Sequence, residues 1–293
     1  MHRRFYVVAS FLLFAAAACL AQREAPADSP AFTTVPELAA GFHSLYAQNF
    51  EEAREKFTDW ESRHPDEPFG YAAIAASYLF EELYRQGVLS SDFFLNEKRF
   101  LHGIEGKPDP GRMKNFQIAV DQARKLAKQR LAKDPRDAGA LFALTLAAGM
   151  QSNADMILKK QHLDALKRLK EGNEYAKQLL VLRPGDGDAY VALGTANYII
   201  GSLSGGARFM LWFGGIHGDK KLGMEQLLKT IDHGRYLQPF AKILLALAAR
   251  REKKDVLAQK LLRELSQEFP ESSLYSGEYA KAMGRFAPTQ MHP

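Results

Sequence analysis

The sequence predicts an all-α protein made of consecutive helix pairs. Apolar residues recur at spacings of three and four in segments such as 189–201 and 240–251, which is the periodicity of amphipathic helices. Four segments share one layout, in which a helix ends at X-Pro, a short turn follows and a new apolar helix begins: HPDEPFGYAAIAASY, DPRDAGALFALTLAAG, RPGDGDAYVALGTANY and FPESSLYSGEYAKAM. No convincing alternation of apolar and polar residues indicates a β-strand.

Residues 1–21 have the pattern of a secretory signal. A basic start, with Arg3 and Arg4, precedes a short apolar core at 7–18, which is too short to span a membrane comfortably. We therefore expect an exported, periplasmic protein from which this segment is removed. A retained N-terminal anchor is a third interpretation, beside the two cleavage interpretations that follow.

Two cleavage interpretations compete at the end of this signal. The run Cys19-Leu20-Ala21 before Gln22 suits an ordinary signal peptidase, whereas Ala16 to Cys19 resembles a loose bacterial lipobox in which Cys19 would carry lipid. We favour ordinary cleavage because a lipobox usually has a larger apolar residue where Ala16 stands. Cys19 is the one cysteine, so on this interpretation the mature chain has no disulfide, cysteine zinc site or thiol nucleophile. A lipid on Cys19 would instead anchor the protein to the envelope, and it is the only membrane contact we expect.

Two end segments are expected to lie outside the folded body. Residues 22–34 are rich in Pro and Ala and predict a flexible leader, and residues 287–293 predict a disordered tail. The segment 35–286 between them is expected to form the helical domain.

The charge of the chain predicts a mixed-sign surface. The formal net charge is +5, from 39 basic and 34 acidic residues, and a nucleic-acid partner is not expected because such proteins usually show a clustered basic face. Two amphipathic basic runs, at 123–133 and 158–170, are interpreted as solvated helix faces rather than as a surface for an acidic partner.

The helix pairs have a common internal pattern. In the first pair, the second helix is expected to start near Asn49 with an acidic first turn and to stop before Pro65. Each pair places bulky or aliphatic residues at fixed positions, and small residues where its two helices must cross closely. The residues in these positions are Gly41, Ala53, Phe57, Tyr71, Ile74, Ala75, Tyr78, Leu141, Leu144, Thr145, Ala148, Tyr190, Leu193, Gly194, Asn197, Gly223, Leu245, Ala246, Ala258, Leu262 and Leu265.

This layout resembles the tetratricopeptide repeat, a helix–turn–helix unit of roughly 34 residues. The resemblance implies a right-handed α-solenoid of about five helix pairs over 35–286, with a C-terminal capping helix near 273–285. The chain resembles divergent bacterial exported tetratricopeptide proteins and, more loosely, the periplasmic T-component of TRAP transporters. The resemblance implies a fold and a binding groove, and no functional residue is carried over from it.

The spacing of the repeats indicates insertions. The positions that end each unit are residues 65, 135, 184, 235 and 270. The first three spacings exceed the repeat length and place extra residues near 83–110, 150–164 and 201–217, each between the first and second helix of its pair. Because such turns lie along one edge of a stacked array, we expect the insertions to thicken that edge. Arg235 stands where the pattern expects proline, and Asp219 is interpreted as the N-cap of the helix after the third insertion.

Aromatic residues in these insertions are the strongest functional signal. They either pack on one another and seal the edge, or line a pocket or a contact patch. The candidate partner- or ligand-binding residues are Phe93, Phe94, Phe100, His102, Phe209, Trp212, Phe213 and His217, together with Tyr71, Tyr190 and Asn197, whose repeat positions also favour a packing role.

We expect no catalytic, metal or cofactor site. The histidines form no HExxH or close metal pair, GGIHGDKKLG lacks the P-loop spacing, and no GxSxG, kinase or dinucleotide fingerprint is present. The sequence therefore predicts a non-enzymatic scaffold that binds a protein or peptide partner in its concave groove and at the insertion edge. The alternative is a ligand-binding component of a transport system, with an enclosed pocket for a small apolar ligand. A hydrolase on a helical frame is a third hypothesis, for which no nucleophile is visible.

Overall fold

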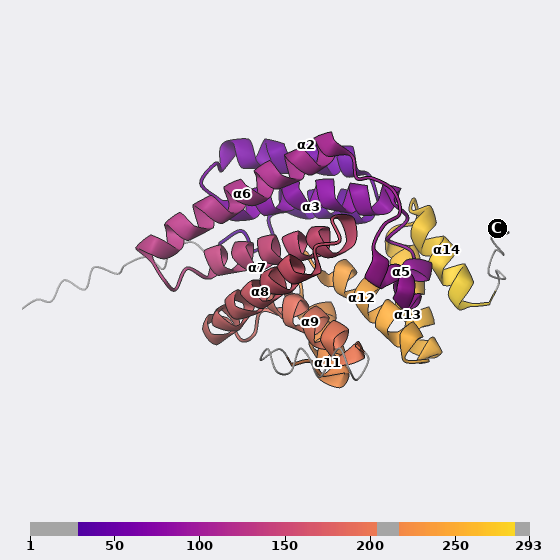
Figure 1. Cartoon of the computed structure of the whole chain (residues 1–293). Coiled ribbons are helices and arrows are strands. Elements are labelled where there is room, and N and C mark those ends of the chain that lie inside the picture. Colours follow the sequence, from indigo (N-terminus) through magenta and orange to yellow (C-terminus); the bar gives the residue numbers. More distant parts are fainter. Residues whose placement is uncertain (1–28, 204–216, 285–293) are drawn as a thin grey trace, which may run out of the picture.

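The computed structural model describes residues 29–203 and 217–284, and the secondary structure of these ranges is helical, with no β-strand (Figure 1). The all-α prediction is therefore confirmed for this part of the chain. The helices are α1 (Pro36–Tyr46), α2 (Phe50–Arg63), α3 (Pro68–Arg85), α4 (Ser91–Leu95), α5 (Glu97–His102), α6 (Pro110–Lys133), α7 (Ala138–Asn153), the π-helical turn η1 (Ala154–Leu158), α8 (His162–Leu182), the 3₁₀ turn η2 (Gly187–Ala189), α9 (Tyr190–Ser202), α11 (Lys220–His233), α12 (Gln238–Arg251), α13 (Asp255–Glu268) and α14 (Ser273–Ala282).

Local sequence signals begin and end these helices. Acidic residues fill the first turn of α2, and this helix ends just before Pro65, as predicted. At the start of α11, the side chain of Asp219 accepts a hydrogen bond from the N–H of Leu222 at 2.9 Å. The predicted N-cap is therefore confirmed. Helix α14 occupies the place of the C-terminal helix expected near 273–285.

The helices pack in two layers. Each long helix packs on the next one along the chain, from α1 to α14 with α4 and α5 set aside. In addition, the first helices of successive pairs contact one another, in the order α1, α3, α7, α9 and α12. These five helices therefore form an inner layer, and α2, α6, α8, α11 and α13 lie outside it (Figure 1).

Small residues lie where two helices of a pair approach closely. A Cβ atom on Gly41 would overlap the ring of Phe57, which comes from the second helix of the same pair. A Cβ atom on Gly223 of α11 would lie 2.5 Å from the backbone nitrogen of Tyr198 on α9, and one on Gly194 would meet Gly223 in turn. The close contact between α9 and α11 therefore depends on the absence of side chains at both glycines.

Residues of the turns that precede α12 and α14 also pack against α1, the first helix. The ring of Tyr236, just before α12, lies 5.1 Å from the ring of Phe42 on α1. The hydroxyl of Tyr46 donates to the carbonyl of Tyr236 at 3.0 Å, and Tyr236 donates in turn to the carbonyl of Thr33 at 2.7 Å. Phe269, which precedes α14, packs on Tyr46 as well. The described helices are thus linked from end to end, whereas an open array contacts only its neighbours.

Aromatic side chains from several helix pairs meet beside this contact. Phe42, Phe69, Phe142 and Tyr236 come from different helix pairs, and all four side chains are buried in one core cluster. Bringing these aromatic rings together removes their apolar surface from water, which is favourable. In the described part of the chain, buried core therefore fills the space between the inner helices of the first and last pairs.

Part of the segment 22–34, which was expected to be a flexible leader, is described by the structure. Residues 29–34 lie within the described structure, and Ala31 and Phe32 are buried. The ring of Phe32 packs on Phe142 with 5.7 Å between ring centroids, and the guanidinium of Arg183 lies 4.2 Å from the Phe32 ring centroid. The ring of Phe32 and the hydrogen bond from Tyr236 to Thr33 therefore hold this segment on the core, in a stretch whose composition suggested a linker.

The turn before α12 is held by a buried carboxylate. Asp188, which is 1% exposed, accepts hydrogen bonds at 3.0–3.1 Å from the backbone N–H groups of Arg235, Tyr236 and Leu237. The side chain of Arg235 also pairs with Asp186 at 2.5 Å. A proline at position 235 would lack the N–H that Asp188 binds. The departure from the repeat pattern at Arg235 therefore has a structural cause.

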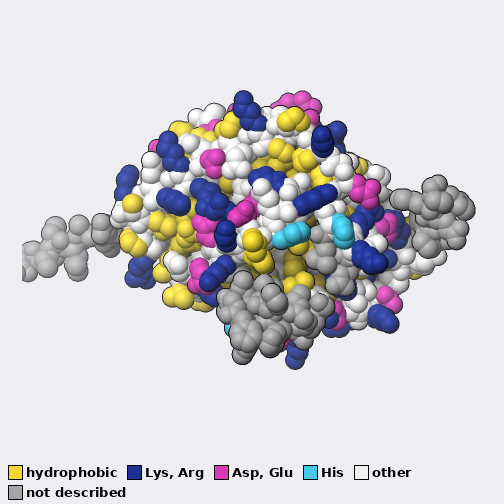
Figure 2. All heavy atoms as spheres, in the orientation of Figure 1, with side chains coloured by type: hydrophobic (Ala, Val, Ile, Leu, Met, Phe, Trp, Pro, Cys, Tyr) yellow, Lys and Arg dark blue, Asp and Glu magenta, His cyan; other side chains and the backbone are white. Residues whose placement is uncertain are grey.

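Charged side chains of both signs are mixed on the surface. Figure 2 shows Lys and Arg beside Asp and Glu over the face that it draws. In the basic run at 158–170, Lys167 pairs with Asp164 at 3.0 Å and Arg168 pairs with Glu171 at 3.1 Å. Arg124 of the other basic run binds the same Glu171 at 2.6 Å. Much of the positive charge in both runs is therefore balanced locally.

Candidate functional site

The first insertion folds into the two short helices α4 and α5 and gathers its aromatic residues. The rings of Phe93 and Phe94 are 5.3 Å apart, and those of Phe94 and Phe100 are 5.9 Å apart. Phe93 is buried, with 1% of its surface exposed, whereas Phe94 and Phe100 are half-buried. Phe93 therefore belongs to the core of the insertion, and the other two rings lie closer to the surface.

The second insertion packs against the first. Its residues extend α7 into the π-helical turn η1, and little of it remains as loop. The N–H of Ile104 donates to the carbonyl of Ile157 in η1 at 3.0 Å. Phe93, Ile104, Ile157 and Leu158 are buried in the same core cluster. These two insertions therefore meet, as the sequence analysis expected for the thickened edge.

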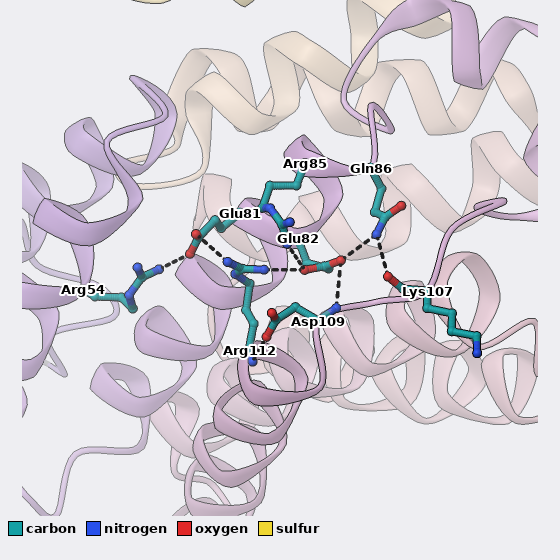
Figure 3. Close-up of polar contacts among 8 residues, drawn as sticks. All are labelled: Arg54, Glu81, Glu82, Arg85, Gln86, Lys107, Asp109 and Arg112. Atoms are coloured by element: carbon teal, nitrogen blue, oxygen red, sulfur yellow. Dashed lines mark hydrogen bonds and ion pairs between the residues drawn. The ribbon is translucent and has the colours of Figure 1, made fainter.

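A polar network ties the two ends of the first insertion together (Figure 3). At its centre is Glu82 on α3, whose side chain is 0% exposed. One carboxylate oxygen of Glu82 accepts from the Gln86 side chain at 2.8 Å and from the Asp109 N–H at 3.3 Å. The other oxygen pairs with Arg112 on α6 at 2.6 Å. Gln86 and Asp109 flank the insertion, so one buried carboxylate fixes where the inserted chain leaves α3 and where it enters α6.

Glu81 extends this network to α2. Its two oxygens bind Arg54 at 2.6 Å and Arg112 at 2.9 Å. The two neighbouring carboxylates of α3 are thus engaged by arginines from two other helices, which accounts for both of them as structural ties. Buried charges of this kind are stable only when they are paired and hydrogen-bonded.

The network leads to a prediction for pH. Burial opposes ionisation of Glu81, but hydrogen bonds from Arg112 and Arg54 outweigh it and hold the pKa of Glu81 below its ordinary value of 4.5. A lowered folded-state pKa gives stability that is present above the unfolded pKa and is lost as the pH falls through the folded pKa. We therefore expect the acid-induced loss of unfolding free energy below about pH 4.5 to be shallower in Glu81→Gln than in the parent protein.

Urea denaturation at several pH values between 7 and 3 measures this slope. Glu174→Gln changes an exposed glutamate of α8 and should leave the slope as in the parent. Identical acid slopes for Glu81→Gln and the parent would contradict the prediction.

An apolar pocket lies between the first insertion and the inner helices α9 and α12. Its volume is about 80 Å³. Phe94 and Phe100 supply one wall, and residues on one side of α9 and one side of α12 supply the others. The described lining residues are Phe94, Phe100, Thr195, Tyr198, Ile199, Ser202, Leu203, Leu227, Leu244, Leu247, Ala248 and Arg251. Most of this lining is apolar, and polar groups are few, which is the usual composition of a small-molecule site.

Two polar side chains are fixed within the pocket wall. The hydroxyl of Tyr198 lies 3.3 Å from the carbonyl of Ala248 and 3.3 Å from the carboxylate of Glu252. Burial raises the pKa of Tyr198 to about 12, so its hydroxyl stays protonated near neutral pH. The hydroxyl oxygen of Ser202 is buried and has no hydrogen-bond partner among the described residues. The polar groups of the pocket are therefore found near the C-terminal ends of α9 and α12.

The structure brings together only some of the residues that the sequence singled out. Phe94 and Phe100 line the pocket, and Phe93 supports them from the core. His102 is exposed, with its Nδ1 atom 2.7 Å from the carbonyl of Lys98, and His217 is also exposed. Cys19, Phe209, Trp212 and Phe213 lie outside the described residues.

The remaining candidates make contacts with neighbouring segments of the helical array. Tyr190 donates to the carbonyl of Pro184 at 2.8 Å, and Asn197 donates to Gln226 on α11 at 2.9 Å. Tyr71 is half-buried on α3, and burial raises its pKa to about 12. None of the three lines the described pocket. Their contacts agree with the packing role that their repeat positions favoured.

Sequence reasoning missed the residues that α9 and α12 contribute. Thr195, Tyr198 and Ser202 recur at helical spacing, and so do Leu244, Leu247 and Arg251. This is the pattern of an ordinary buried helix face, so spacing alone could not mark these residues as a pocket. The one unusual feature of these residues is Arg251, a charged residue that lies on the same side of its helix as the apolar residues.

Within residues 29–203 and 217–284, no group of three or more His, Cys, Asp or Glu side chains is placed to hold a metal ion. None of the described helices is both long and apolar enough to cross a membrane. No protein-family model matches the chain, and no curated protein matches it.

Proposed function

We propose that the protein is an exported, non-enzymatic binding protein that holds a small apolar ligand in the pocket beside the first insertion. The observation that carries this proposal is the pocket itself, which is walled by Phe94, Phe100 and apolar residues of α9 and α12. Pockets of this composition hold small molecules by excluding water from their apolar surface. On this proposal, the first insertion supplies part of the pocket wall, and the pair of Glu82 and Arg112 holds the insertion in place.

We also propose that the helix pairs belong to a right-handed solenoid of about five tetratricopeptide-like pairs. The ordered packing of inner and outer helices and the small residues at the pair crossings support this. Export follows from the signal pattern of residues 1–21, with Cys19 as the alternative lipid anchor. The resemblance to the T-component of TRAP transporters makes a role in a transport system the most natural setting for a ligand-binding protein.

A scaffold that binds a protein or peptide partner in its groove has less support. Its groove would lie along the inner helices, and Phe69, Phe142 and Tyr236 are buried there. Such a partner would have to displace these packed rings before it could bind. The pocket needs no such rearrangement, and for this reason we favour the small ligand.

Filling the pocket tests the proposal. Leu247 lines the pocket on α12 and is only half-buried, so Leu247→Trp can place a larger side chain in the cavity without a large cost to the core. We expect decan-1-ol, a narrow apolar chain, to bind the purified full-length protein saturably in isothermal titration calorimetry, and its affinity to fall about tenfold or more in Leu247→Trp.

The matched control is Val256→Trp, which places the same side chain at an 83% exposed position of α13 outside the pocket. This control should bind the probe within about twofold of the parent. Thermal denaturation of both variants checks that they are folded. Equal probe affinity in Leu247→Trp and the parent, or no saturable binding to the parent, would refute the proposed function.

A further inference from the structure

The lining residues of the pocket lie on successive helical turns. Thr195 of α9 and Leu244 of α12 lie toward one end of the pocket, together with Leu227 of α11, which lies beside Gly194. Tyr198 and Ala248 lie one turn further along their helices, at the same level, since the Tyr198 hydroxyl is 3.3 Å from the Ala248 carbonyl. A further turn along α9 and α12 brings Ser202 and Arg251.

Contacts around this last turn show that Ser202 and Arg251 lie at the same end of the pocket. Gly201, next to Ser202, packs on the backbone of Lys220, since a Cβ atom on Gly201 would lie 2.7 Å from the Lys220 nitrogen. The side chain of Lys220 in turn reaches Glu252, the neighbour of Arg251, at 2.8 Å. The end of the pocket that carries Ser202 and Arg251, which we call the rim, is therefore more polar than the end that carries Leu227 and Leu244.

The rim carries one positive charge that no carboxylate among the described residues pairs with. Glu252 is engaged by Lys220 and contacts the Tyr198 hydroxyl. The hydrogen bond from Lys220, and to a smaller extent the charge of Arg251, hold the pKa of Glu252 below its ordinary value. Arg251 lines the pocket but forms no ion pair with any described residue. Because Glu252 pairs with Lys220, the guanidinium of Arg251 can pair with the anionic group of a ligand.

We infer that the ligand is an amphiphile with one carboxylate, whose alkyl chain lies among Phe94, Leu244 and Leu247 and whose head group binds Arg251 at the rim. This inference rests on the proposed function and names the chemical class of its ligand. A guanidinium matches a carboxylate with two parallel hydrogen bonds. The buried hydroxyl of Ser202 lies at the same end and offers a further donor.

The size of the pocket favours a chain over a ring. Its 80 Å³ is about half of the roughly 150 Å³ of an apolar cavity that binds benzene. A straight alkyl chain presents a narrower cross-section than an aromatic ring and gains about 0.8 kcal/mol for each buried CH₂ group. An anionic head group can then remain partly hydrated at the rim, so that it does not bear the full cost of burial.

Three probes of equal chain length test the inference: decanoate, decan-1-ol and decyltrimethylammonium, each below its critical micelle concentration. Isothermal titration calorimetry with the purified full-length protein reports their affinities. We expect decanoate to bind about tenfold more tightly than decanol, and the cation to bind more weakly than either. In Arg251→Met, which keeps most of the aliphatic stem, decanoate should fall to the affinity of decanol, and decanol should be unchanged.

Arg263→Met is the matched control, since Arg263 is an exposed arginine on the neighbouring helix α13 and its removal changes the net charge equally. It should leave all three affinities within about twofold of the parent. If decanoate and decanol bind equally while Leu247→Trp still weakens both, the pocket stands and the carboxylate preference is wrong. An equal loss of decanoate binding in Arg251→Met and Arg263→Met would also overturn the assignment to Arg251. If decanol binds at a site that Leu247→Trp blocks but decanoate does not bind there, the ligand class is wrong while the proposed function stands.

Discussion

Arg112→Met is expected to lower the free energy of unfolding by about 3–5 kcal/mol. Arg112 is the cation nearest to Glu82, at 2.6 Å, and the Glu82 side chain is 0% exposed. Methionine leaves this carboxylate with Gln86, the Asp109 N–H and the more distant Arg85, at 3.6 Å. A buried charge that loses its close partner keeps its desolvation cost and loses the attraction that offset it. Glu81 would lose one of its two arginines in the same step.

Urea denaturation followed by circular dichroism measures this loss at pH 7. Arg168→Met removes an arginine from a pair with Glu171 in which its side chain is 42% exposed, and it should cost less than about 1 kcal/mol. Arg112→Lys keeps the charge without the forked geometry and is expected to fall between the two. A loss below about 1 kcal/mol in Arg112→Met would show that the network of Figure 3 does not hold the insertion.

The same variant links stability to function. Glu82 and Arg112 fix the two ends of the first insertion, and this insertion places Phe94 and Phe100 in the pocket wall. In Arg112→Met, weaker probe binding at temperatures where the protein is still folded would indicate that the insertion has moved away from α9 and α12. The network would then position the site in addition to stabilising the fold.

Helix identity and helix order could be predicted from the sequence because their signals are local. Pro65 and the residues around it end one helix and start the next, and Asp219 caps α11 within three residues of its own position. The crossing of α9 and α11 was also predictable, because Gly194 and Gly223 are small enough to let the two helices approach closely. Such features depend on neighbours in the chain or on a repeated spacing.

The contacts that close the structure and form the pocket could not be predicted in the same way. Tyr236 donates a hydrogen bond to Thr33, which is 203 residues earlier in the chain, and Phe32 packs on Phe142. Tyr236 and Phe32 both lie outside the helices, so no helical pattern marks either of them. The pairing of Glu82 with Arg112 spans the first insertion, so no repeat spacing connects the two residues. In the pocket wall, Phe94 and Phe100 were predicted because they are aromatic residues of an insertion. Leu244 and Leu247 have the spacing of ordinary core residues of a helix. Only three-dimensional packing distinguishes a core stripe from a pocket wall.

Asp188→Ala is expected to cost about 3–5 kcal/mol of unfolding free energy. The Asp188 carboxylate is the acceptor for three successive backbone N–H groups, those of Arg235, Tyr236 and Leu237. Alanine would leave these donors without their acceptor, and Tyr236 and Leu237 are buried, so water cannot easily replace the lost bonds. Because each unsatisfied buried donor costs about 1–3 kcal/mol, the loss should exceed that of most single substitutions.

Two further variants identify the cause of this loss. Asp188→Asn keeps one acceptor oxygen, which can still serve Arg235 and Leu237, so it should cost only about 1–2 kcal/mol. Asp232→Ala removes an exposed carboxylate at the end of α11 and should stay within about 0.5 kcal/mol of the parent. Because the turn that Asp188 holds sets the start of α12, which carries Leu244, Leu247 and Arg251, Asp188→Ala should also weaken probe binding before it unfolds the protein. Equal stability of Asp188→Ala and Asp232→Ala would show that the three N–H groups find other acceptors, and that Asp188 does not determine the position of α12.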